Sequence, residues 1–183
     1  MSGIIRDIEP WFMKGLEVRA SRIHGDGLHT QKDIKRDAVI LRMGGCFFLL
    51  SDRCTSSVMP STITPISDQV ILAESVMGDK DYSDYINHSC NPNIGFLDAL
   101  TIVAIDDICI GEELVIDYAF WESDEQWILK YICNCGSPQC RRNVTGLDWK
   151  SFTSSDKKYL YFSPFLRRRI LTLGERGVTN DRE

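Results

Sequence analysis

The sequence has no long apolar run and no excess of basic charge. Its longest apolar stretch, residues 38–50, is interrupted by Arg42 and falls short of the roughly 18 residues that a membrane-spanning helix needs. Arg6, Asp7 and Glu9 precede any apolar run, which is not the pattern of a signal peptide. The 21 Lys and Arg residues are outnumbered by 26 Asp and Glu residues, and the net charge of −5 argues against direct nucleic-acid binding. We therefore expect an intracellular protein that binds no membrane, cytoplasmic in a bacterium and nuclear in a eukaryote.

Internal repeats and low-complexity segments are also missing, and the composition is that of a globular domain. Hydrophobic residues make up 43% and charged residues 26% of the 183 residues, which excludes a disordered or collagen-like chain. A chain of this length forms one domain, or a domain with an appendage, and can bury a core without disulfide bonds. The seven cysteines are odd in number. Without a secretory signal, they are interpreted as thiols or metal ligands.

Short apolar or alternating segments, separated by turn residues, dominate residues 16–118. The expected strands are 16–23, 38–41, 69–73, 94–96, 101–105 and 113–116, with a glycine turn at 24–27. Gly44 and Gly45 are expected to end the second strand, and residues 51–66 to form a loop. Cys46 and Cys109 lie among apolar residues and are interpreted as small buried side chains. This pattern predicts a β-rich domain.

The last third of the chain carries helix signals. The segment Ser123–Gln126 fits a capping box in front of apolar residues, which predicts a short helix. Ser163 and Pro164 form a clearer helix start, as the N-cap and the first helical residue. Apolar residues then recur at helical spacing, and Gly174 is expected to end this second helix.

Three cysteines lie within the eight-residue segment CNCGSPQC, at positions 133–140. Their spacing around a Gly-Ser-Pro turn lets three thiolates converge on one tetrahedral ion, and zinc prefers such soft ligands. A structural zinc site needs a fourth ligand, and the available thiols are Cys46, Cys54, Cys90 and Cys109. Three exposed thiols without a metal would be open to oxidation, so metal binding is favoured over a loop of unpaired thiols.

Two other motifs precede this cluster. The segment Asn87–Asn93, NHSCNPN, is a polar loop whose composition alone is ordinary turn chemistry. Ser89 follows His88 directly, but adjacent side chains rarely face each other and no hydrolase motif surrounds the pair. The segment GEELVIDY is a turn and a strand that end at Tyr118, which by itself indicates only a half-buried packing residue.

In this order and spacing, NHSC, GEELVIDY and CNCGSPQCR resemble the motifs of SET-domain protein lysine methyltransferases that carry a post-SET zinc motif. The resemblance covers residues 16–145 and places Gly25-Asp26-Gly27-Leu28 at the family's G-x-G turn. It implies a SET fold of small curved sheets with a C-terminal pseudoknot, an exception to the rule against threaded connections. The implied division is a lead-in at 1–15, a SET domain at 16–120, a post-SET segment at 121–145 and a C-terminal helical extension at 146–183. That extension resembles the tail of small stand-alone SET proteins.

The resemblance implies transfer of methyl groups from S-adenosylmethionine to the ε-amine of a lysine in a protein substrate. Tyr118 would be the catalytic residue, with Ile116 and Phe120 along the substrate channel. The cofactor would bind at Gly25, Gly27, Leu28, Tyr85, Asn87, His88 and Val144. One structural zinc ion would be held by Cys90, Cys133, Cys135 and Cys140. The acidic balance of the chain suits a basic protein substrate, such as a histone.

The chain departs from the family pattern at two sites. Arg42-Met43-Gly44-Gly45 stands where many members have Tyr-x-Gly-Glu, and Ile116 stands where many have Phe or Tyr. The smaller Ile116 predicts room for more than one added methyl group. A SET-fold zinc-binding interaction module without catalysis is the alternative interpretation. A zinc-binding structural domain unrelated to methyl transfer would explain the cysteines but not GEELVIDY.

Overall fold

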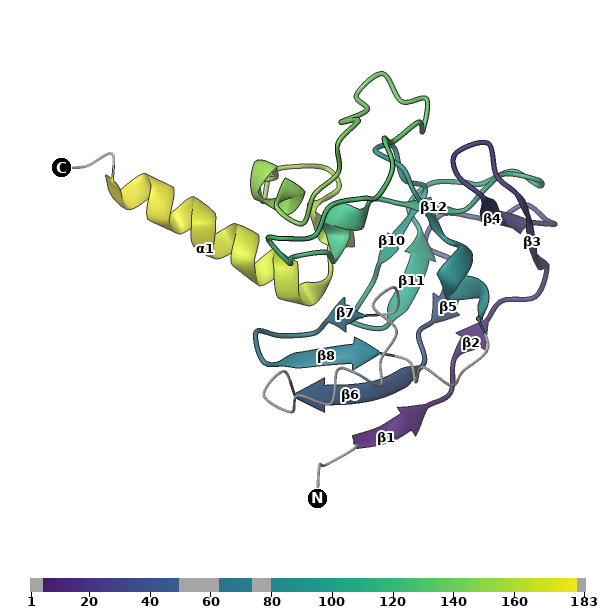
Figure 1. Ribbon diagram of the computed structural model, residues 1–183, viewed down its shortest axis with the longest axis horizontal. Helices are drawn as coiled ribbons and strands as arrows, with labels where there is room; N and C mark the ends of the chain where they lie inside the picture. Colours follow the sequence, from purple (N-terminus) through teal and green to yellow (C-terminus); the bar gives the residue numbers. More distant parts are fainter. Residues whose placement is uncertain (1–4, 50–62, 74–79, 181–183) are drawn as a thin grey trace.

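The computed structural model describes residues 5–49, 63–73 and 80–180 of the protein. In these ranges the chain forms small, mostly antiparallel sheets and one α-helix, α1 (Pro164–Asn180), which extends away from the sheets on one side (Figure 1). None of the helices in these ranges is long and apolar enough to cross a membrane. The β-rich class predicted from the sequence is confirmed.

Two four-stranded antiparallel sheets form the body of the molecule. The first has the order β10 (Ile94–Phe96), β11 (Thr101–Ala104), β5 (Val39–Arg42) and β2 (Trp11–Phe12). The second has the order β1 (Ile5–Ile8), β6 (Gly45–Leu49), β8 (Val70–Ala73) and β7 (Thr64–Pro65). Residues 5–12 of the expected lead-in therefore contribute a strand to each sheet.

Two smaller strand pairs carry the sequence motifs. β3 (Leu16–Ala20) and β4 (Asp26–Thr30) form a hairpin, closed by the N–H of Ser21 donating to the carbonyl of Gly25 at 2.8 Å. Gly25 has a φ of +51°, which glycine adopts without strain. β9 (Asn87–His88) follows the 3₁₀ helix η3 (Tyr82–Tyr85) and pairs in parallel with β12 (Val115–Ile116). This pairing brings NHSC and GEELVIDY together.

The C-terminal extension packs into the main core. After β12 come the 3₁₀ helices η4 (Tyr118–Phe120), η5 (Asp148–Ser151) and η6 (Tyr159–Tyr161). Phe162, Phe165, Leu166 and Ile170 are buried in the same cluster as residues of the first sheet. The ring centres of Phe120 and Phe162 lie 4.6 Å apart. Because each buried side chain of this size contributes about 1.5–3 kcal/mol, the extension is a large part of the stability of the fold.

Most predicted strands are present, with boundaries shifted by a few residues. The prediction at 94–96 coincides with β10, whereas the strand predicted at 113–116 is limited to β12. Gly45 begins β6 instead of ending a strand, because its φ of +115° redirects the chain into pairing with Ile8. Residues 51–62 of the predicted loop lie outside the described residues.

Cys46 and Cys109, the two cysteines that lie among apolar residues in the sequence, differ in burial. Cys46 lies half-buried in β6, opposite Ala73. Cys109 is exposed, so its assignment as a buried strand residue is wrong. The isolated β-bridge between Ile34 and Ile108 is the last backbone pairing before a turn, and Cys109 lies in that turn.

The helix predicted from Ser163 is confirmed at its start but not at its end. The N–H of Leu166 donates to Oγ of Ser163 at 3.3 Å, as an N-cap requires. Gly174 does not end α1, which continues to Asn180. Gly174 lacks the positive φ that stops a helix at a glycine. A glycine that remains helical costs only about 1 kcal/mol relative to alanine.

The helix predicted after Ser123 is wrong. Instead, residues 127–129 pair with residues 144–146 in an extended arrangement. The N–H of Leu129 donates to the carbonyl of Val144 at 2.9 Å, and the N–H of Gly146 donates to the carbonyl of Trp127 at 3.0 Å. These backbone groups are therefore not free to form helical hydrogen bonds.

Candidate functional site

Four cysteine thiols converge where the post-SET segment meets the loop after β9. The Sγ atoms of Cys90, Cys133, Cys135 and Cys140 all lie within 4.8 Å of one another. Cys90 and Cys133 are buried and the other two are partly exposed. Four thiolates around one point are the donor set of a closed, structural zinc site. The ligands inferred from the resemblance are therefore the ones that the fold brings together.

His88 connects the thiol cluster to Tyr118. Its Nδ1 accepts the backbone N–H of Tyr118 at 3.1 Å, so the ring proton resides on Nε2. Nε2 in turn donates to Sγ of Cys90 at 3.3 Å. Burial lowers the pKa of His88 to about 4, which agrees with a neutral ring. A ring that donates to a metal-binding thiolate fixes the orientation of that ligand.

Tyr118 is held at its hydroxyl as well as at its backbone. Its hydroxyl donates to the carbonyl of Ile86 at 3.0 Å. Its ring centre lies 4.7 Å from that of Trp121 and 6.0 Å from that of Trp127. Burial raises the pKa of Tyr118 above its ordinary value, so the phenol keeps its proton at neutral pH. The side chain can thus orient a substrate group by hydrogen bonding but is not a base.

Tyr118 forms part of the wall of a pocket of about 270 Å³. The apolar part of this wall includes Leu41, Met43, Ile86, Phe96, Ile116, Trp121 and Trp127. Asp84 and Glu122 also line it, and burial raises the pKa of both carboxyls. Lys80 is a third charged residue at the wall, so the lining carries two acidic groups and one basic group. An apolar and aromatic pocket with an excess of acidic groups fits an alkyl chain that ends in a cation.

The two residues expected in a substrate channel differ in position. Ile116 lines the pocket. Phe120 does not line it, because its fully buried ring packs in the main core. Trp121 and Trp127 supply the aromatic wall instead and were missed from the sequence. The sequence signal for them is the run of aromatic residues after Tyr118, but Trp127 directly follows the predicted capping box, and the expected helix there does not form.

The residues expected at the cofactor fall into two groups. Gly25, Gly27, Asn87 and His88 come together between the β3–β4 hairpin and β9. The side chains of the other three lie in different surroundings. Leu28 is fully buried in the main core, Val144 is fully buried beside the thiol cluster, and Tyr85 is half-buried in η3 with Nζ of Lys80 at 5.7 Å from its ring centre.

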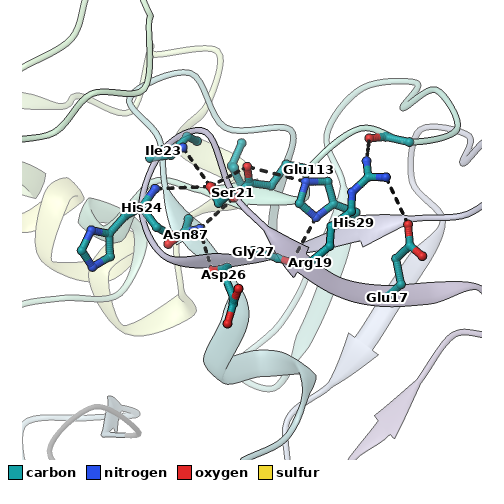
Figure 2. Close-up of polar contacts among 12 residues, drawn as sticks. Glu17, Arg19, Ser21, Ile23, His24, Asp26, Gly27, His29, Asn87 and Glu113 are labelled. Atoms are coloured by element: carbon teal, nitrogen blue, oxygen red, sulfur yellow. Dashed lines mark hydrogen bonds and ion pairs between the residues drawn. The ribbon is translucent and has the colours of Figure 1, made fainter.

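Asn87 belongs to a polar cluster around Glu113 (Figure 2). Its Nδ2 lies 3.0 Å from the carbonyl oxygen of His24, 3.1 Å from that of Asp26 and 2.8 Å from Oε1 of Glu113. A Cβ atom on Gly27 would lie 2.3 Å from Oε1 of Glu113. Gly27 is therefore required by the carboxylate of Glu113, a reason that the sequence pattern did not reveal.

Gly27→Ala is expected to destabilise the protein by about 1–3 kcal/mol, because the added methyl group must displace a carboxylate that is held by other hydrogen bonds. Thermal unfolding of the purified variant measures this loss. Gly174→Ala is the matched control, because nothing lies within 4 Å of the added Cβ. Equal melting temperatures for the two variants would contradict the expectation.

Arg141 joins the post-SET segment to Asp117, the N-cap of η4, and to η5. Its Nη1 and Nη2 donate to Oδ2 and Oδ1 of Asp117 at 2.8 and 2.5 Å. Its Nε lies 2.7 Å from Oδ2 of Asp148, as an ion pair without hydrogen-bond alignment. Its backbone N–H donates to Sγ of Cys90 at 3.3 Å. The residue after the last cysteine thus fastens the thiol cluster to the rest of the fold.

Comparisons with known proteins agree with this fold and site. The SET domain family model matches residues 25–119. The chain is 31% identical over 150 residues to the histone-lysine N-methyltransferase trithorax of Drosophila virilis, a match that covers 75% of this chain and 4% of that protein. It is 32% identical over 145 residues to the H3 lysine-4 specific histone-lysine N-methyltransferase of Schizosaccharomyces pombe, covering 70% and 15%. Among solved structures it is similar to KRYPTONITE in complex with mCHG DNA and SAH, with a TM-score of 0.55 and 22% identity over 70% of this chain and 28% of that one.

The structural likeness and the paired motif strands define the fold as a SET fold with an adjoining cluster of four thiols that can hold a metal ion. The family model matches slightly more than half of the chain, and the chain belongs to the SET-domain family. It spans only 4% and 15% of the length of the two curated relatives.

Proposed function

We propose that the protein is a protein-lysine N-methyltransferase that uses S-adenosylmethionine. The observation that carries this proposal is the position of Tyr118, which lies between the neutral ring of His88 and a pocket suited to a lysine side chain. The names of the relatives, all histone-lysine N-methyltransferases, support it. An inactive interaction module is not favoured, because the NHSC motif and the Asp117-Tyr118 pair at the end of GEELVIDY are both intact.

The proposed reaction is an in-line displacement, for which the protein must align the amine with the reacting methyl group. S-adenosylmethionine, when bound, would supply a methyl group on a positively charged sulfur. Gly25, Asn87 and His88, at the turn between β3 and β4 and along β9, are the residues that would bind it in this proposal. The four-thiol cluster would hold one structural zinc ion, which supplies no chemistry to the transfer.

The pocket residues would act on the lysine. Asp84 and Glu122 attract its ammonium form on entry, and the apolar walls then favour the neutral amine that attack requires. The hydroxyl of Tyr118 orients the amine by hydrogen bonding. The released proton passes to solvent, since Tyr118 keeps its own.

The proposed substrate is a basic protein. Its support is the charge of −5 on the chain and the two carboxyl groups in the pocket. The relatives are named for histones, which are basic. We also propose an intracellular location, where histones and similar basic proteins occur.

Tyr118→Phe tests the proposed function. Loss of the hydroxyl is expected to lower kcat about 100-fold or more, because the variant cannot orient the amine. Cofactor affinity is expected to change by less than about threefold, because the hydroxyl bonds to Ile86 and not to the cofactor residues. Labelled methyl transfer to purified core histones and to a whole-cell extract measures kcat, and calorimetry measures the Kd of S-adenosylmethionine.

Tyr161→Phe is the matched control, because the Tyr161 hydroxyl only accepts a hydrogen bond from Arg36 at the surface. Full activity of Tyr118→Phe would exclude the proposed role of the hydroxyl. Failure of the zinc-loaded, folded wild-type protein to bind S-adenosylmethionine would favour the inactive interaction module.

A further inference from the structure

Glu113 is a nearly buried carboxylate at the junction of three motif segments. It precedes β12, it bridges to His29 of β4, and its side chain is 13% exposed. Figure 2 shows it between Ser21 and Asn87 on one side and His29 on the other. Its Oε2 lies 3.9 Å from Nε2 of His29, whose Nδ1 donates to the carbonyl of Gly27 at 3.0 Å. The proposed methyl transfer assigns no role to this group.

The two side chains within hydrogen-bond distance of the Glu113 carboxylate, Ser21 and Asn87, each direct a hydrogen atom at it. Oγ of Ser21 accepts the N–H groups of Ile23 and His24 at 2.9 and 3.3 Å, so its own hydrogen is left for Glu113. Oγ lies 2.8 and 2.9 Å from the two carboxylate oxygens. Nδ2 of Asn87 donates to Oε1 at 2.8 Å. The cluster therefore requires an acceptor without hydrogens, because an amide at this position would direct an N–H group at one of these donors.

This arrangement fixes the orientation of the Asn87 amide. Its nitrogen faces three acceptors, the carbonyls of His24 and Asp26 and the carboxylate of Glu113. A flipped amide would place its oxygen against the same three acceptors, which is unfavourable. The Asn87 Oδ1 atom accepts no hydrogen bond within the described part of the chain, so it is available to a bound molecule.

We infer that Glu113 is the positioning residue of the cofactor site: its carboxylate fixes the Ser21–Gly27 turn and holds the Asn87 amide with its oxygen free for the ligand. This inference rests on the proposed function. Glu113 does not touch the reacting atoms. It acts through Ser21 and Asn87, which belong to segments far apart in the sequence.

Glu113→Gln tests the inference, with Glu112→Gln as the matched control, because Glu112 is exposed and accepts only the N–H of Cys109. The Kd of S-adenosylmethionine, measured by calorimetry, is expected to rise about tenfold to a hundredfold in Glu113→Gln and to stay within about twofold in Glu112→Gln. The KM for the protein substrate and the zinc content are expected to equal those of the wild type. A general loss of structure would change both of these quantities. Glu113→Asp keeps an acceptor without hydrogens and is expected to recover part of the affinity.

A second readout needs no cofactor. The Asn87 side-chain amide protons are expected to exchange slowly with solvent in the wild type and in Glu112→Gln, and rapidly in Glu113→Gln, by NMR. If Glu113→Gln does not fold, Ser21→Ala takes its place in the experiment. The Kd of S-adenosylmethionine is then expected to rise in Ser21→Ala. Wild-type affinity and slow amide exchange in folded Glu113→Gln would overturn the inference while leaving the proposed function intact. No cofactor binding by wild-type protein would overturn the proposed function, and the inference with it.

Discussion

Removal of the metal is expected to unfold the post-SET segment and to abolish cofactor binding. Structural zinc contributes apparent binding free energies of about 10–16 kcal/mol in zinc-finger peptides, and this free energy stabilises the folded state. The four thiols meet from two segments, Cys90 on one and Cys133–Cys140 on the other. Without a shared ion, the loop after β9 and the thiol turn are joined by hydrogen bonds from Arg141 to Cys90 and between Cys135 and the Ser89–Cys90 segment.

The measurement is thermal unfolding with and without a chelator, together with zinc content. We expect metal removal to lower the free energy of unfolding by about 5 kcal/mol, which is at most half of the value for zinc-finger peptides. In a protein of this length, that loss lowers the melting temperature by about 10–20 °C. Cys133→Ser is expected to reproduce the effect of the chelator, because Cys133 is fully buried. Cys109→Ser is the control, because Cys109 is exposed and outside the cluster. A Cys133→Ser variant with one bound zinc and an unchanged melting temperature would refute the assignment.

Arg141→Met is expected to destabilise the protein by about 3–5 kcal/mol, because it leaves the charge of Asp117 buried without its partner. The Asp117 side chain is 1% exposed, whereas that of Arg141 is 24% exposed. Burial alone would lower the pKa of Arg141, but its hydrogen bond with Asp117 raises the pKa above the ordinary value. The guanidinium therefore remains charged at any pH at which the protein folds.

Chemical denaturation of zinc-loaded protein measures this loss. Arg168→Met is the matched control, because Arg168 is exposed on α1. Adding Asp117→Asn to Arg141→Met is expected to restore part of the stability, since the amide removes the buried charge and retains an oxygen for the N–H of Ala119. An Arg141→Met variant as stable as Arg168→Met would show that the ion pair contributes nothing.

The sequence predicts the metal centre well because most of its information is local. Cys133, Cys135 and Cys140 are brought together by one turn, and the resemblance to SET proteins supplies Cys90. The strand at 94–96 is equally local, since its apolar residues and flanking turns determine it. Such features depend on neighbouring residues alone.

Features that depend on distant partners could not be predicted. Glu113 looks like an ordinary exposed acid in GEELVIDY, and only the fold places Ser21 beside it. Arg141 follows the last cysteine without any pattern that points to Asp117. The segment at 127–129 has the apolar spacing of a helix, but pairing with residues 144–146 takes its backbone groups. In each case a contact over long sequence separation outweighed the local pattern.

The integration of the C-terminal extension into the core has a consequence for synthesis on the ribosome. The thiol cluster cannot close until Cys140 has emerged, and the main core cannot close until Ile170 has followed it. The hairpin of β3 and β4 is synthesised early, but its turn is fixed only after Glu113 has been synthesised and can bond to Ser21. Folding is therefore postponed until nearly all of the described chain is outside the exit tunnel, and a nascent chain stalled before this point exposes apolar strands that only α1 and its neighbours would cover.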